Sequence, residues 1–259
     1  MSETRTAPAV TPELIDFFKA HPRLALAFSG GTDSAYLLYA ALACGCDVRA
    51  YYARSPFQPA FELEDARRLA GQLNAEMRVI PLDVLADETV RSNPPDRCYH
   101  CKRRIFSSLL EVAAEDGFDT VIDGTNASDD AGDRPGMRAL RELRVLSPLR
   151  LCGITKDRVR DLSRQAGLFT WNKPAYACLA TRVPAGTPLT AALLERVERA
   201  ETALFDMRFT DFRVRVFHDA ARLQLPAEQL ARALERRGDI RAALKPWFEI
   251  VLLDMEDRG

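Results

Sequence analysis

A short apolar run followed by two glycines is the feature that most constrains the fold of this chain. Residues 24–28 read Leu-Ala-Leu-Ala-Phe, and the run ends at Ser29-Gly30-Gly31-Thr32-Asp33-Ser34. An apolar run of this length that ends at glycines is typical of a buried strand. A helix is expected to follow from Asp33 to about Ala43. A strand that leads through a glycine-rich turn into a helix begins a βαβ unit, and this favours a parallel sheet.

The same alternation of strand and helix continues along the first part of the chain. Further strands are expected at residues 48–53, 77–82 and 120–123, and further helices at 11–20, 61–73, 103–115 and 156–166. Repeated units of this length build a doubly wound parallel sheet of the α/β class with right-handed crossovers.

The pattern changes near residue 170. Segments 212–216 and 221–225 alternate apolar and polar residues on either side of His218-Asp219, which predicts an antiparallel hairpin. Helices are expected at 190–204 and 226–242, and a last strand at 248–253. We therefore predict an α/β domain at residues 1–170 and a smaller C-terminal α+β domain at residues 171–259.

Composition excludes several classes of protein. The 36 Lys and Arg residues against 37 Asp and Glu give a formal net charge of −1, so no global basic field exists to hold nucleic acid. No apolar run approaches the roughly 20 residues that span a bilayer, and the polar N-terminus lacks a signal-peptide pattern. We expect a cytoplasmic protein, in which six cysteines are not a disulfide framework.

The turn from Ser29 to Ser34 has the chemistry of a phosphate-binding loop. Gly30 and Gly31 let the backbone approach an anion, and the N–H groups and dipole of the following helix attract it. The hydroxyls of Ser29 and Ser34 can donate to phosphate oxygens. The Gly-Lys-Ser/Thr ending of a Walker A loop is absent. Asp33 stands at the start of the following helix, where the dipole favours an acidic residue.

Residues after the strand expected at 120–123 belong to the same edge of the sheet. Ligands of open α/β sheets bind beyond the carboxyl ends of the strands. Gly124 and Asn126 are therefore expected nucleotide contacts, with an ordinary turn as the alternative. Arg134 is a further candidate for this cleft, with a solvated loop arginine as the alternative.

Three cysteines stand apart from the other three. Cys98 and Cys101 form a Cys-x-x-Cys pair just before the helix expected at 103–115, a spacing that suits one metal or a redox pair. Arg97, Lys102 and the helix N-terminus favour their thiolate forms, as Arg182 does for Cys178. Three thiolates can hold three irons of a [4Fe–4S] cluster and leave the fourth iron open.

Arg213 and Arg215 alternate with apolar residues, so both point to one face of the expected strand 212–216. Two guanidinium groups on one face suit a phosphate. A solvated sheet face is the alternative.

These motifs resemble known families. The loop Ser29–Ser34 resembles the pyrophosphate-binding loop of the PP-loop ATP pyrophosphatase superfamily, whose members cleave ATP to AMP and pyrophosphate. This resemblance implies that Asp33 helps to hold Mg²⁺, with a helix-start residue favoured by the dipole as the alternative. Several segments together, in conserved order, resemble the LarE family of ATP-dependent sulfur transferases. They are Ser29–Ser34, 123–126, Arg134-Pro135-Gly136, 147–149, 171–174, 178–182 and 213–215.

The resemblance implies a reaction and a set of roles. The family adenylates the carboxylates of a pyridinium biscarboxylic acid mononucleotide with ATP and Mg²⁺ and converts them to thiocarboxylates for a nickel-pincer cofactor. It implies that Arg213 and Arg215 bind the substrate phosphate, in a substrate-binding C-terminal domain. Glu201 is a weaker candidate for a metal or catalytic role. Thr181 stands where the family commonly has serine, and a homo-oligomer is expected on resemblance alone.

Family members supply sulfur in two ways, and both make Cys178 catalytic. In one, the cysteine matching Cys178 gives up its own sulfur and becomes dehydroalanine. In the other, three cysteines hold a [4Fe–4S] cluster that relays sulfide from a sulfur donor. Because the chain has Cys98 and Cys101 in addition to Cys178, we favour the cluster type.

Three other functions stay open at the level of sequence. A PP-loop tRNA thiolase also combines ATP with cysteine chemistry, but it would want a basic face or an added RNA-binding module. An ammonia-using amide synthetase, such as an NAD synthase-like enzyme, has no use for the three cysteines. A non-catalytic nucleotide-binding module would show no turnover of ATP to AMP.

Overall fold

The computed structural model describes residues 9–129 and 135–258 of the chain, which divides into two compact units. The first unit comprises Met1–Ser55, Ala60–Leu82 and Cys98–Ala175. The second comprises Pro56–Pro59, Asp83–Arg97 and Tyr176–Gly259, so it takes in two short segments from the first half of the sequence. The predicted domain boundary between residues 170 and 171 stays a prediction.

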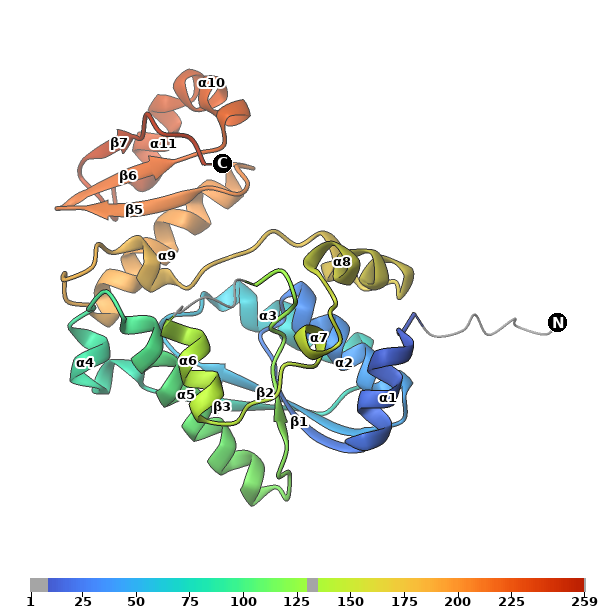
Figure 1. Ribbon diagram of the computed structural model, residues 1–259. Helices are drawn as coiled ribbons and strands as arrows, with labels where there is room; N and C mark the ends of the chain where they lie inside the picture. Colours follow the sequence, from blue (N-terminus) through green and yellow to red (C-terminus); the bar gives the residue numbers. More distant parts are fainter. Residues whose placement is uncertain (1–8, 130–134, 259) are drawn as a thin grey trace. The chain divides into compact units, whose positions relative to one another are not determined.

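The first unit is built on a parallel sheet (Figure 1). Its strand order is β3-β2-β1-β4, and the pairs β1–β2, β1–β4 and β2–β3 are all parallel. The four strands are β1 (Arg23–Ala27), β2 (Asp47–Arg54), β3 (Met77–Pro81) and β4 (Val121–Ile122). Because β1 and β4 are neighbours, the loops that follow them leave the sheet side by side. The predicted doubly wound α/β fold is confirmed.

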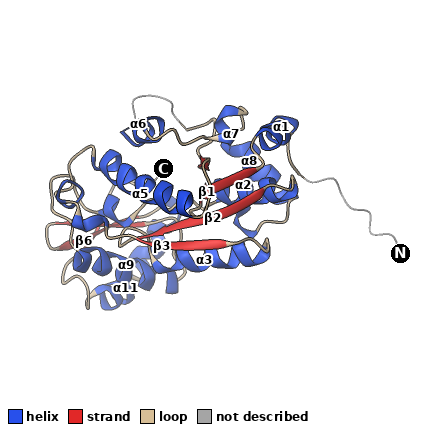
Figure 2. Ribbon diagram, turned by 90° about the horizontal axis from the view of Figure 1, so that it is seen from below, coloured by secondary structure: helices blue, strands red, loops and turns tan. Residues whose placement is uncertain are grey.

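Helices cover both faces of this sheet, and Figure 2 shows α5 on one side and α3 on the other. The pleat of β1 sends Leu24 and Leu26 into one hydrophobic core and Ala25 into the other. The helices of the unit are α1 (Pro12–Ala20), α2 (Thr32–Ala43), α3 (Ala60–Gln72), α5 (Arg97–Glu115), α6 (Pro135–Glu142), α7 (Pro148–Leu151), α8 (Lys156–Gln165) and the 3₁₀ turn η2 (Phe169–Asn172).

Helix α5 begins at Arg97, six residues before the predicted start at Arg103. The prediction that the Cys-x-x-Cys pair precedes this helix is therefore wrong, because Cys98 and Cys101 lie in its first turns. The residues 97–102 are polar and aromatic and show no apolar helical spacing, so periodicity gave no signal there.

The second unit has a small mixed sheet with strand order β5-β6-β7. Strands β5 (Arg213–Phe217) and β6 (Ala220–Gln224) form the predicted antiparallel hairpin, and β7 (Val251–Leu253) pairs parallel to β6. Strand β7 starts three residues later than predicted. The single helix predicted at 226–242 is two, because the backbone at Arg236 leaves the helical region between them. The other elements are η1 (Val84–Ala86), α4 (Glu88–Arg91), η3 (Leu179–Arg182), α9 (Ala191–Asp206), α10 (Ala227–Glu235) and α11 (Arg237–Leu244).

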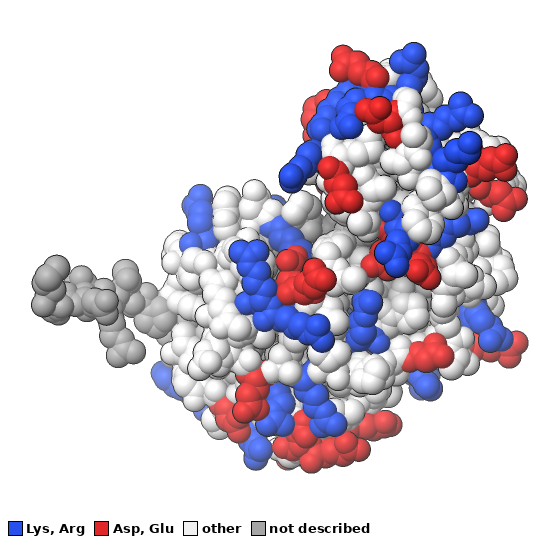
Figure 3. All heavy atoms as spheres, turned by 180° about the vertical axis from the view of Figure 1, so that it is seen from behind, with Lys and Arg blue, Asp and Glu red and all other residues white. Residues whose placement is uncertain are grey.

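Surface charge has no dominant sign on the face that Figure 3 shows. Lys and Arg side chains lie interspersed with Asp and Glu there, in keeping with the net charge of −1. Among the helices of the described residues, none is both long enough and apolar enough to cross a lipid bilayer.

Candidate functional site

The phosphate loop joins β1 to α2 and is held in shape by its own hydroxyl groups. The Ser34 Oγ accepts a hydrogen bond from the Ser29 backbone N–H at 3.3 Å, and the two serine Oγ atoms lie 3.0 Å apart. The Ser29 Oγ accepts from the Gly31 N–H at 3.3 Å. Because Gly31 is the N-cap residue of α2, it has no side chain with which to cap the helix. The first-turn N–H groups, which lack partners inside a helix, are thus placed to bind an anion.

Two glycines allow the close packing of this loop. Gly30 has a φ of +72°, and a Cβ there would lie 2.9 Å from the Ala66 Cβ on α3. Gly124, after β4, approaches the loop from the other side, since its Cβ would lie 2.9 Å from the Ser34 backbone nitrogen and 3.3 Å from the Asp33 Cβ. Any side chain at residue 124 would therefore press against the backbone at the start of α2.

Asp33 is held between a cation and an amide. The Lys156 Nζ lies 2.5 Å from the Asp33 Oδ2, and the Asn126 Nδ2 donates to the Oδ1 at 3.4 Å. Burial raises the pKa of Asp33, and the hydrogen bond and charge of Lys156 partly oppose this rise. Asn126 is buried. Its hydrogen bond to Asp33 brings together two of the residues that the sequence predicted at the nucleotide site.

The loop after β4 is ordered by a buried carboxylate. Asp123 accepts hydrogen bonds from the Thr125 Oγ1 at 2.5 Å and from the Ser147 Oγ at 2.6 Å. The Asn126 N–H donates to the Asp129 Oδ2 at 2.8 Å. These bonds fix Gly124 and Asn126 beside the phosphate loop.

A cavity of about 550 Å³ lies at this edge of the sheet, within the first unit. It is open to the carboxyl ends of β1 and β4, where open α/β sheets bind their ligands. Its lining comes from the phosphate loop, the start of α5, the loop after β4 and the start of α6. The residues are Ala27, Ser29, Gly31, Asp33, Ser34, Cys98, Lys102, Phe106, Asp123, Gly124, Thr125, Asp129, Gly136 and Met137.

The cavity wall brings a thiol into the predicted nucleotide site. Cys98 is exposed and lines the cavity, together with Lys102 one helical turn further along α5. Cys101 is half-buried. The side chain of Lys102 packs where Gly136 leaves room, since a Cβ at residue 136 would lie 3.0 Å from the Lys102 Cδ. A basic group and a sulfur atom thus share the cavity with the phosphate loop.

Cys178 belongs to the second unit and is half-buried at the start of η3. The Arg97 Nη2 lies 3.9 Å from its Sγ. The Thr181 Oγ1 donates to the Cys178 carbonyl at 2.8 Å, and Arg182 donates to the Ala177 carbonyl at 2.8 Å. The Thr181 hydroxyl therefore helps to fix the backbone of the cysteine.

A buried ion pair supports the segment that carries Cys178. The Arg182 Nε lies 2.9 Å from the Glu201 Oε1, with side-chain exposures of 0% and 1%. The Glu201 carboxylate also accepts hydrogen bonds from the Tyr176 hydroxyl and, at 2.9 Å, from the Val214 N–H of β5. Burial would lower the pKa of Arg182, but the hydrogen bonds and charge of Glu201, together with the nearby Tyr176 and Cys178, outweigh burial and raise it. Burial and the nearby Glu201 charge raise the pKa of Tyr176.

Arg213 and Arg215 lie near this ion pair, in the same unit as Cys178. The Arg215 Nη1 donates to the Thr181 carbonyl at 3.2 Å. Burial and the charges of Arg182 and Arg258 lower the pKa of Arg213 to about 10, and burial and Arg182 also lower the pKa of Arg215. Arg213 therefore stays charged at neutral pH. An anion bound beside them would offset this mutual repulsion.

Metal ligation by the predicted residues remains a prediction. In residues 9–129 and 135–258, no three His, Cys, Asp or Glu side chains gather in a way that could hold a metal ion. The three thiols are of the right chemistry for an iron–sulfur cluster, and Cys98 and Cys101 lie in the first unit while Cys178 lies in the second. Both Glu201 oxygens already accept hydrogen bonds. Arg134 falls outside the described residues.

Several partners of the site were missed at the level of sequence. Lys156 is 123 residues from Asp33, and Arg97 is 81 residues from Cys178. Tyr176 was not singled out although it contacts Glu201. No motif links such distant positions, so only the folded chain identifies them.

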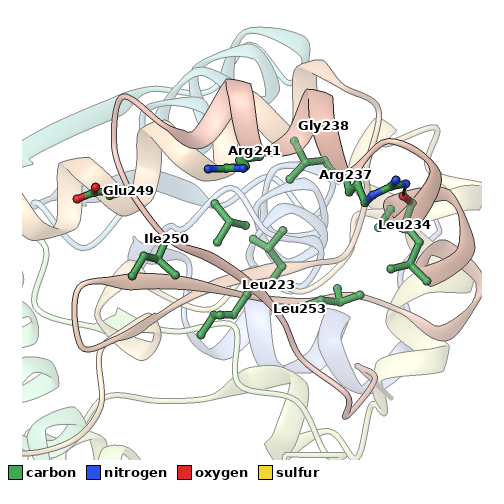
Figure 4. Close-up of a pocket in the computed structure, with 12 residues that line it drawn as sticks. Leu223, Leu234, Arg237, Gly238, Arg241, Glu249, Ile250 and Leu253 are labelled. Atoms are coloured by element: carbon green, nitrogen blue, oxygen red, sulfur yellow. Dashed lines mark hydrogen bonds between the residues drawn. The ribbon is translucent and has the colours of Figure 1, made fainter.

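A second cavity, of about 560 Å³, lies in the second unit between β7 and helices α10 and α11 (Figure 4). Leu223, Leu234, Ile250 and Leu253 form its apolar surface, with Arg237, Arg241 and Glu249 at the rim. None of the predicted site residues lines it. The chemistry therefore concentrates at the phosphate loop and around Cys178.

Comparisons with known proteins identify a matching family and relatives that cover nearly the whole chain. The family described as "Thiamine biosynthesis protein (ThiI)" matches residues 20–205. The pyridinium-3,5-bisthiocarboxylic acid mononucleotide synthase of Lactiplantibacillus plantarum is 35% identical over 93% of this chain and 89% of its own length. The uncharacterized protein slr1717 of Synechocystis is 36% identical over 94% of this chain and 92% of its own length.

A more distant relative covers a smaller part of the molecule. The tRNA-specific 2-thiouridylase MnmA 1 of Clostridium botulinum is 29% identical over 58% of this chain and 52% of its own length. The near full-length matches, the parallel sheet and the phosphate loop lead to one assignment. The chain belongs to the LarE family of ATP-dependent sulfur transferases within the PP-loop ATP pyrophosphatase superfamily.

Proposed function

We propose that this enzyme adenylates a carboxylate of a pyridinium biscarboxylic acid mononucleotide and converts it to a thiocarboxylate. The observation that carries the proposal is a thiol whose loop is contacted by arginines: Arg97 contacts the Cys178 sulfur, Arg182 donates to the Cys178 carbonyl, and Arg215 donates to the Thr181 carbonyl. Guanidinium groups suit the phosphate and carboxylates of such a substrate, and the thiol supplies sulfur chemistry. The near full-length relative from Lactiplantibacillus plantarum supports the same substrate.

The first half-reaction consumes ATP at the phosphate loop. A carboxylate oxygen of the substrate attacks the α-phosphate, the bond to pyrophosphate breaks, and an acyl adenylate forms. The N–H groups at the start of α2 and the hydroxyls of Ser29 and Ser34 hold the departing pyrophosphate. Mg²⁺ would neutralise its charge, and Asp33 and Asp129, which both line the cavity, are the oxygen ligands suited to hold it.

The second half-reaction places sulfur on the activated carbon. If Cys178 is the donor, its sulfur attacks the acyl carbon and AMP leaves. Loss of the Cys178 α-proton then breaks the Cβ–S bond, so the thiocarboxylate departs and dehydroalanine remains. Thr181 and Arg182 hold the Cys178 backbone during these steps.

We favour the route in which Cys98, Cys101 and Cys178 hold a [4Fe–4S] cluster. When bound, this cluster would supply a sulfide from an external donor, so that Cys178 survives turnover. The support is that Cys98 lines the nucleotide cavity. In addition, Arg97, which contacts the Cys178 sulfur, directly precedes Cys98 in the chain.

Anaerobic purification with iron and sulfide analysis tests this route. Wild-type protein is expected to bind iron and sulfide, and Cys98→Ala and Cys101→Ala variants to lose them. Cys152→Ala, in a half-buried position outside the site, is the matched control and is expected to keep them. A colourless, iron-free protein that is active and loses one H₂S from Cys178 per turnover would contradict the cluster route and support the sacrificial one.

A tRNA thiolase is the second candidate, favoured by the match to a tRNA-specific 2-thiouridylase over 58% of this chain. Near-neutral charge and the mixed surface charges weigh against it. Filter binding of bulk tRNA at physiological salt decides between the two. Absence of tRNA binding at that salt concentration supports the small-molecule substrate, and tight tRNA binding supports the thiolase.

Two further properties belong to this proposal. A homo-oligomer is expected from the family, and light scattering of the purified protein measures it. An enzyme that depends on ATP and on reduced thiols suits the cytoplasm.

A further inference from the structure

The guanidinium group of Arg97 is buried and held by hydrogen bonds. Arg97 is only 6% exposed. Its Nη1 donates to the Asn93 Oδ1 at 2.8 Å and to the Ala180 carbonyl at 2.9 Å, and its Nη2 lies 3.9 Å from the Cys178 Sγ. One planar group therefore contacts both the cysteine sulfur and the backbone two residues further on.

Asn93 fixes this guanidinium from the other side. It is buried, with 2% of its surface exposed, and it has a φ of +56°, a conformation that costs free energy and is retained where surrounding contacts hold it. Its Nδ2 donates to the Pro184 carbonyl at 2.8 Å and to the Thr187 carbonyl at 3.2 Å. Asn93 thus ties Arg97 to the segment that follows Cys178.

The backbone next to the cysteine is anchored to the same group of residues. The Leu179 N–H donates to the Phe57 carbonyl at 2.9 Å, and the Arg97 guanidinium lies over the Phe57 ring, 5.7 Å from its centroid. These contacts fix the segment that follows Cys178 relative to Arg97.

Arg182, the arginine nearest to Cys178 in the sequence, is committed elsewhere. Its donors go to Glu201 and to the Ala177 and Cys178 carbonyls. Sequence proximity predicted that Arg182 would act on the sulfur, whereas the structure gives a side-chain contact to the sulfur from Arg97.

We propose that Arg97 is a positioning residue that fixes the Cys178 sulfur and places a permanent positive charge beside it. A fixed charge there attracts an anionic reactant to the sulfur, and the N–H···S contact holds the sulfur in one orientation. The inference rests on the proposed function in one respect only: it takes Cys178, as sulfur donor or as cluster ligand, to be part of the site that an anionic substrate approaches.

Charge-selective alkylation of the full-length chain tests this role. The reduced, chelator-treated protein reacts with iodoacetate, which is anionic, or with iodoacetamide, which is neutral. Peptide mass spectrometry then gives the rate at Cys178 alone. The ratio of the iodoacetate rate to the iodoacetamide rate reports the local charge, because the reactive fraction of the thiol cancels between the two reagents.

Matched variants separate charge from fold. Arg97→Gln removes the charge and keeps N–H donors for the Ala180 carbonyl, whereas Arg97→Lys keeps the charge. Arg91→Gln, in the same unit with 52% of its side chain exposed, is the control for loss of one positive charge. We expect the ratio to fall roughly fivefold in Arg97→Gln, and to stay near the wild-type value in Arg97→Lys and Arg91→Gln.

Two outcomes overturn the inference. One is a ratio in Arg97→Gln equal to that in Arg91→Gln, and the other is an equal fall in Arg97→Lys and Arg97→Gln. Failure of the proposed function looks different, since wild-type protein would then form no thiocarboxylate while the alkylation ratios still report on Arg97.

Discussion

Replacing Gly124 by alanine tests whether the loop after β4 completes the phosphate site. The new methyl group would lie 2.9 Å from the Ser34 backbone nitrogen and 3.3 Å from the Asp33 carbonyl carbon. Both are backbone atoms at the start of α2, so no flexible side chain can move aside. The alanine must either push the loop away from α2 or cover the Ser34 N–H.

The two consequences have different magnitudes. Forcing an extra methyl into a packed contact costs about 1–3 kcal/mol of stability. A hydrogen bond from an N–H to a charged group contributes about 1.5–3 kcal/mol, so its loss weakens ATP binding by roughly 10- to 150-fold. We therefore expect the KM for ATP to rise by at least about tenfold while the protein still folds.

Pyrophosphate release against ATP concentration measures the binding effect, and urea unfolding measures stability. Gly71→Ala is the matched control, because a Cβ at residue 71 of α3 meets no atom within 4 Å. It should leave the KM unchanged and raise stability by about 0.5–1 kcal/mol through helix propensity. If Gly124→Ala has a wild-type KM for ATP, the reasoning about the Ser34 N–H is wrong.

Three further predictions concern charged groups. Asp33→Ala should abolish pyrophosphate release from ATP, and unchanged release would remove Asp33 from the site. Glu201→Ala leaves the buried Arg182 without its carboxylate partner and should cost about 3–5 kcal/mol in urea unfolding, whereas Glu195→Ala, in an exposed pair, should change stability by less than about 1 kcal/mol. The hydrogen bonds from Arg78 and Tyr51 lower the pKa of Asp116 to about 2. As the pH falls, Asp116 of the unfolded chain therefore takes up a proton at a higher pH than Asp116 of the folded protein. The free energy of unfolding should fall as the pH drops from about 4 towards 2. Asp116→Asn should flatten that part of the stability curve, and an unchanged curve would refute the assignment.

Local patterns predicted the parts of this molecule that local physics determines. The parallel sheet followed from apolar strands such as 24–28 and from the glycines that end them. The turn from β1 into α2 followed from Ser29 to Ser34, because its shape depends on neighbours in the chain. The hairpin at Arg213–Gln224 followed from strict alternation of apolar and polar residues.

The parts that could not be predicted depend on tertiary contacts. The start of α5 at Arg97 lacks apolar spacing, so its cysteines were placed outside the helix. The bond between Lys156 and Asp33 and the contact of Arg97 with Cys178 join distant residues, and no spacing rule connects them. The break at Arg236 needed knowledge of how α10 and α11 pack on the small sheet.

The most direct test of the sulfur-transfer claim is mass spectrometry of the substrate after an anaerobic reaction. Pyridinium biscarboxylic acid mononucleotide is incubated with the enzyme, Mg²⁺ and ATP, and the products are analysed together with AMP. We predict a product in which sulfur replaces a carboxylate oxygen, formed with AMP by wild-type protein and absent with Cys178→Ala. AMP without any sulfur-containing product, or the same product from Cys178→Ala, would contradict it.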